Sequence, residues 1–193
     1  SGIEKGWEAL SSDDKSKPCV LEARAYVEFT KVEDEFKDYE AIDFNTTNQN
    51  KLLKAVEKKQ SLIEELAAKY KAVIDLKHPE YAIASAYRIA IVSKLMADAF
   101  LNSPCPKQLT DDQCGMYQAA LQEQAFPHED AAIQLFDEVL QQAYGAKFYN
   151  EWLVKAQDAL KAYEPHRFPA IQTYGLVASE PTKQSPRLAE TYQ

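Results

Sequence analysis

Residues 81–101, YAIASAYRIAIVSKLMADAFL, constrain the fold of this chain more than any other stretch. Apolar and small residues occupy most of these positions, and six of them are alanines, which have the highest helix propensity and let neighbouring backbones approach closely. A helix that is hydrophobic around nearly its whole circumference belongs in the interior of a protein. The sequence therefore predicts a central helix at 81–101 with other helices packed around it.

The rest of the chain shows the period of amphipathic helices. Apolar residues recur every three or four positions over about 18–44 and 49–77, and again in three shorter segments that end near 125, 145 and 163. The stretch NTTNQN and the prolines at 79, 127 and 165 separate these segments. Strand-like alternation is nearly absent, so the sequence predicts an all-α protein of about six helices.

The expected architecture is a set of antiparallel helical hairpins in a right-handed array like that of tetratricopeptide repeats. Residues 1–18 form a flexible lead-in, and 19–165 form the helical-repeat domain. A long hairpin at 19–77 is followed by shorter hairpins at 80–126 and 128–165. The Pro-punctuated residues 166–193 form an extended, irregular tail.

Three helix boundaries carry specific signals. Thr110 with Gln113 three residues later predicts a capping box at the start of one helix. Phe126-Pro127 predicts a break between that helix and the next, and Gly145 is expected to be the C-cap that ends the second of them.

The stretch from Tyr81 to about Pro169 also resembles a known group. Its marks are the A-x-YRI helix, the P-x-P-x-x-L-T turn, the FP-x-E-D-x-A-I turn and the closing E-W…L…P pattern. These resemble the C-terminal part of large tetratricopeptide-repeat proteins of deltaproteobacteria, some of which are tied to gliding motility. The resemblance covers about half the chain and departs from the pattern at Ala90, where a glycine is more common. It implies a scaffold in a multiprotein complex of the cell envelope, in the periplasm or at the outer membrane.

The three cysteines allow two interpretations. Cys105 and Cys114 flank the turn PCPKQLTDDQC, and a disulfide between them would staple this loop in an oxidising periplasm. The alternative is three free thiols, with Cys19 alone near the start. The first residues, SGIEKGWEAL, lack a signal-peptide pattern, so an export signal would have been removed ahead of them.

Several function classes find no support in the sequence. The net charge of −8 argues against nucleic acid as a partner, and no apolar run is long enough to span a membrane. The cysteine and histidine spacing does not fit a metal site, and no nucleotide-binding or nucleophile motif is present. We therefore expect no cofactor, no metal and no enzymatic activity.

The sequence favours a protein or peptide as the partner. Tyrosine and arginine are common interface anchors, and a helical array presents a concave face for a peptide or helix. The residues expected to form this groove are Tyr87, Arg88, Ile91, Tyr117 and Trp152. For Arg88 the alternative is an acidic partner on a neighbouring helix.

The function predicted from these features is a non-enzymatic interaction scaffold of the bacterial cell envelope, in a motility or envelope-assembly complex. The alternative is a terminal capping module of a longer solenoid, which protects the solenoid core and has no binding site of its own.

Overall fold

The structure is a computed structural model that describes residues 2–168. The described residues form seven helices and no strand, which confirms the all-α prediction. The helices are α1 (Gly2–Ala9), α2 (Ser12–Lys15), α3 (Pro18–Glu40), α4 (Gln49–Ile74), α5 (Pro79–Leu101), α6 (Asp111–Gly145) and α7 (Glu151–Tyr163).

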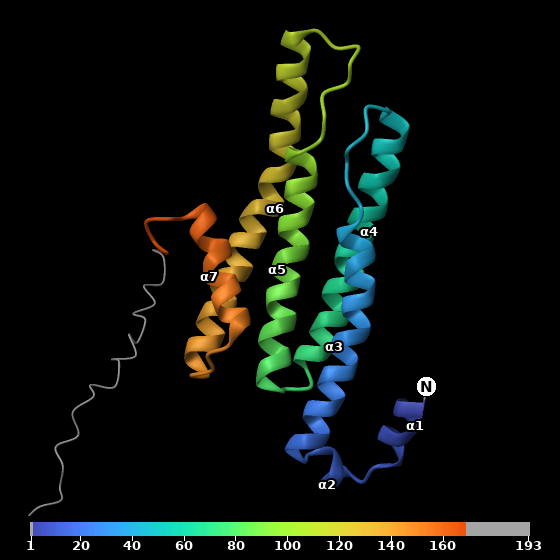
Figure 1. Ribbon diagram of the computed structural model, residues 1–193, viewed down its shortest axis with the longest axis vertical. Coiled ribbons are helices and arrows are strands. Elements are labelled where there is room, and N and C mark those ends of the chain that lie inside the picture. The colour runs from blue at the N-terminus through green and yellow to red at the C-terminus, as the bar shows by residue number, and fades with distance from the viewer. Residues whose placement is uncertain (1, 169–193) are drawn as a thin grey trace, which may run out of the picture.

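Helix α5 lies at the centre of an elongated bundle, as predicted for residues 81–101 (Figure 1). The hairpin of α3 and α4 packs on one side of it and α6 and α7 pack on the other. The circumference of α5 is divided among three core clusters. Ala84 and Val92 face α3 and α4, Tyr87 and Ala90 face α6 and α7, and Phe100 packs near the end of the helix against Phe44.

The break predicted at Phe126-Pro127 is wrong, because α6 runs through Pro127 without interruption. A proline inside a helix removes one backbone hydrogen bond and costs about 3 kcal/mol. Packing on both sides of it offsets this cost: Ala125 and Ala132 are fully buried against the core. The hairpins predicted at 80–126 and 128–165 therefore share one helix of 35 residues.

The chain before α3 also differs from the prediction. Residues 2–15 of the expected flexible lead-in are largely helical, in α1 and α2. Trp7 holds them near α3, since the guanidinium of Arg24 lies 5.3 Å from the centroid of its ring and the amine of Lys15 lies 5.7 Å from it. The expected irregular tail at 166–193 lies outside the described residues from 169 onward.

Of the two predicted helix caps, one is confirmed. Thr110 caps α6 and forms the full capping box with Gln113. Gly145 is the last residue of α6 and not its cap, which is Ala146. The left-handed backbone conformation occurs later, at Lys147 with φ of 53°. The predicted cap therefore differs from the observed one by a single residue.

Candidate partner-binding site

Four of the five residues expected in a groove come together inside the bundle. Tyr87 is buried, and its ring centroid lies 5.7 Å from that of Phe136 and 5.5 Å from that of Trp152. Ile91 is half-buried between two core clusters. Trp152 reaches from α7 to Phe29 on α3, with ring centroids 5.9 Å apart. These residues join helices of the bundle to one another.

Arg88 is held by an acidic residue on a neighbouring helix, as its alternative interpretation proposed. Its Nε donates to Glu33 Oε1 at 2.8 Å and its Nη2 donates to Glu33 Oε2 at 2.6 Å. The Tyr70 hydroxyl donates to the same carboxylate at 2.6 Å. The guanidinium also lies 4.6 Å from the Phe36 ring centroid and 5.3 Å from that of Trp152. Arg88 thus links α3, α4, α5 and α7, and its Nε and Nη2 both donate to Glu33.

Tyr117, the fifth expected residue, lies at the opposite end of the bundle from α1 and α2. The loops 41–48 and 102–110 meet at this end, which we call the distal end (Figure 1). The Ser103 hydroxyl is buried and lies 3.3 Å from both the Phe44 carbonyl oxygen and the Tyr117 hydroxyl. Ser103 therefore joins the two loops to the first half of α6.

A disulfide between Cys105 and Cys114 also holds the distal end, with Cα atoms 5.8 Å apart. It connects loop 102–110 to the first turn of α6, next to the capping box at Thr110. Cys19 is exposed and free. The loop is therefore attached to α6 at several points along its length.

The distal end contains a pocket of about 250 Å³. Its apolar lining comes from Leu52 on α4, Tyr117 on α6 and two residues of loop 102–110, Pro106 and Leu109. Its polar lining consists of Thr46, Thr47, Gln49 and Gln108. Sites for drug-sized ligands occupy roughly 300–1,000 Å³, so this pocket is nearer the size of one or two inserted side chains. Sequence reasoning identified only Tyr117 among its lining residues, because the pocket forms between two loops that are distant in the sequence.

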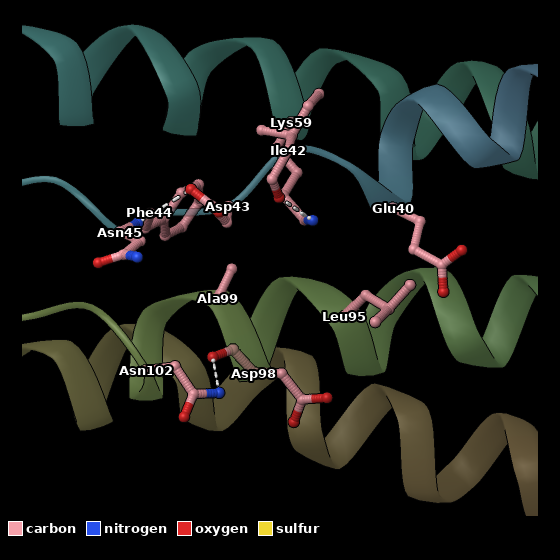
Figure 2. A pocket seen from close by; sticks show the side chains of 10 residues that line it. All are labelled: Glu40, Ile42, Asp43, Phe44, Asn45, Lys59, Leu95, Asp98, Ala99 and Asn102. Carbon is pink, nitrogen blue, oxygen red and sulfur yellow. Dashed lines mark hydrogen bonds between the residues drawn. The ribbon is translucent and has the colours of Figure 1, made fainter.

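A second pocket, of about 180 Å³, lies where α3 ends beside α4 and α5 (Figure 2). Lys59 is buried there at 2% exposure, and its amine donates to the carbonyls of Ile42 at 2.6 Å and Tyr39 at 3.2 Å. Burial lowers the pKa of Lys59, while the carboxylates of Asp43, Glu40 and Asp98 oppose that shift. The amine satisfies carbonyls at the end of α3, as a C-terminal cap does. Lys59 therefore caps the end of α3 beside this pocket, and it was not singled out from the sequence.

The described residues show no group of three or more His, Cys, Asp or Glu side chains that could hold a metal ion. Among the helices of residues 2–168, none combines the length and apolarity that crossing a membrane requires. The predicted partner type, a protein or peptide, stays a prediction.

Buried tyrosines give the fold a defined dependence on alkaline pH. Burial raises the pKa of Tyr163 to about 12 and raises those of Tyr39 and Tyr70 further above the ordinary value of 10.0. Because these pKa values are higher in the folded protein, the neutral hydroxyls contribute stability that is complete below pH 10. That stability is lost as the pH rises through the folded-state values.

We therefore expect an alkaline titration to show helix loss by circular dichroism together with a late rise in tyrosinate absorbance at about pH 12. Complete ionisation of all tyrosines near pH 10 with the helical signal intact would contradict the burial of the Tyr39, Tyr70 and Tyr163 hydroxyls.

Comparison of the chain with protein-family models, with curated proteins and with solved structures found no match in any of the three. The resemblance to tetratricopeptide-repeat proteins of deltaproteobacteria stays a prediction from the sequence.

Proposed function

We propose that this chain is a non-enzymatic protein–protein interaction scaffold of the bacterial cell envelope, in a motility or envelope-assembly complex. The observation that carries the proposal is the distal pocket. Its apolar lining from Leu52, Leu109 and Tyr117 can receive an apolar side chain, and its threonine and glutamine side chains can hydrogen-bond a partner's backbone.

The attachment of loop 102–110 supports a binding role for this pocket. The loop is held in place without a partner by three features: the disulfide, the capping box and the buried Ser103. Binding to a pre-organised site costs less conformational entropy than binding to a site that must first be ordered. A stable partner complex can therefore rest on a small pocket.

The Cys105–Cys114 pair supports the proposed compartment. Disulfides persist in oxidising compartments such as the bacterial periplasm and are rare in the cytosol. The assignment to an envelope complex of bacteria comes from the sequence resemblance.

Affinity purification from the native organism, followed by binding measurements with each purified candidate, tests the proposal. Leu109→Glu places a charge in the pocket lining, so it should lower the affinity of a true partner by about tenfold or more. Val154→Glu is the matched control, since Val154 is 44% exposed on α7 and does not line this pocket. It should leave the affinity unchanged.

A partner that binds wild type and the control equally, and the Leu109 variant at least about tenfold more weakly, would support the scaffold function. If every recovered protein binds the Leu109 variant as tightly as wild type, the distal pocket is not the binding site. If the affinity purification recovers no partner protein, the alternative function, a terminal capping module, is favoured.

A further inference from the structure

The outward side of α6 carries a regular stripe of exposed residues, which we call the outer stripe. Its six members follow one another at intervals of three or four, which places them on one side of a helix: Asp112, Met116, Ala119, Glu123, Phe126 and Asp130. All six are exposed. Met116 is 74% exposed and Phe126 is 67% exposed.

The outer stripe is separate from the side of α6 that faces the bundle. Leu121 packs against a core cluster, and Ala125 and Ala132 are fully buried. The upper half of α6 projects beyond the end of α5, and α7 lies lower along α6 (Figure 1). Met116 and Phe126 are thus large apolar side chains exposed on the side of α6 that faces away from the bundle.

The charge of α6 defines what this surface can accept. The helix contains seven Asp and Glu residues and no Lys or Arg over its whole length. Within residues 2–168, Asp112 and Glu123 form no ion pair, and Asp130 accepts a hydrogen bond only from Gln134 on its own helix. The acids of the outer stripe are therefore available to cations from another molecule.

We propose that the outer stripe docks a basic amphipathic helix of a partner protein, in side-by-side packing. Residues at these intervals lie along one side of a helix, so a helix packed beside α6 would contact them together. The partner's apolar residues would cover Met116 and Phe126, and its Lys or Arg residues would face Asp112, Glu123 and Asp130. A second copy of α6 is a poor occupant, because it would place acids against acids. The proposal rests on the proposed scaffold function and specifies a further surface for it.

Two synthetic helical peptides, tested against the full chain by fluorescence anisotropy, provide the probe. Both carry the same apolar residues at intervals of three and four, and one has Lys where the other has Glu, at positions that face the three acids. We expect the Lys peptide to bind at least about tenfold more tightly than the Glu peptide. The double variant Glu123→Lys with Asp130→Lys should bind the Glu peptide more tightly than the Lys peptide. The single variant Phe126→Ser should lower the affinity for the Lys peptide by about tenfold.

The control variant is Glu22→Lys with Asp38→Lys, which makes the same change in net charge at exposed positions of α3. It should leave binding of the Lys peptide within about twofold of wild type. An equal loss in this control would show that overall charge attracts the peptide and would overturn the proposal. Equal affinity for the two peptides would also overturn it, as would a wild-type dimer in sedimentation that Phe126→Ser dissociates.

The Leu109→Glu variant separates this proposal from the distal pocket. It should bind the Lys peptide like wild type, because Leu109 is not in the outer stripe. A pocket-dependent partner together with no Lys-peptide preference would leave the scaffold function standing and remove only the outer stripe.

Discussion

Replacing Arg88 by Ala is expected to lower the free energy of unfolding by about 3 kcal/mol, near the lower end of what breaking a buried ion pair costs. The Glu33 carboxylate would lose its bidentate partner while its side chain is only 19% exposed. The ring faces of Phe36 and Trp152 would lose the guanidinium that lies beside them. Chemical denaturation monitored by circular dichroism measures the change.

An exposed ion pair on the same helix as Glu33 supplies the control. Lys37 pairs with Asp34 at 2.9 Å, but both side chains are more than 70% exposed. Lys37→Ala should therefore cost less than about 1 kcal/mol. Replacing Glu33 and Arg88 together by Met should cost less than Arg88→Ala alone, because no unpaired charge is then left inside. A loss below about 1 kcal/mol for Arg88→Ala would contradict an interior role and return Arg88 to the candidates for partner binding.

Removing the disulfide with Cys105→Ser and Cys114→Ser is expected to cost about 2.5–3 kcal/mol. This is the chain-entropy value for releasing a loop of about ten residues in the unfolded state. The exposed Cys19 is the matched control, and Cys19→Ser should leave stability within about 0.5 kcal/mol of wild type. Intact mass after alkylation, with and without reductant, should show one reactive thiol in the oxidised protein and three after reduction.

The loss of stability on removing the disulfide should be concentrated at the distal end. Hydrogen exchange should accelerate in loop 102–110 and in the first turns of α6, and change little around Ala84 and Val92 in the core. Three reactive thiols in unreduced protein would contradict the pairing. If hydrogen exchange in the Cys105→Ser, Cys114→Ser variant equals that of wild type, then Ser103 and the capping box hold the loop without the disulfide.

The amino-acid sequence was sufficient to predict the features that depend on local preference and on period. The all-α class, the central position of 81–101 and the capping box at Thr110 follow from alanine content, apolar spacing and the hydrogen-bonding capacity of a threonine. The spacing of Cys105 and Cys114 likewise suggested the pair that the structure brings together.

Only the tertiary structure decided which residues are inside and where a surface for binding forms. Pro127 stays within α6 because burial of Ala125 and Ala132 on either side offsets a local cost that sequence rules treat as a break. Tyr87 and Arg88 have the residue types of interface anchors, yet both contact residues of other helices within the bundle. Tyr87 packs against Phe136, and Arg88 pairs with Glu33. The distal pocket forms from two loops whose proximity no local pattern encodes, because long-range packing alone brings them together.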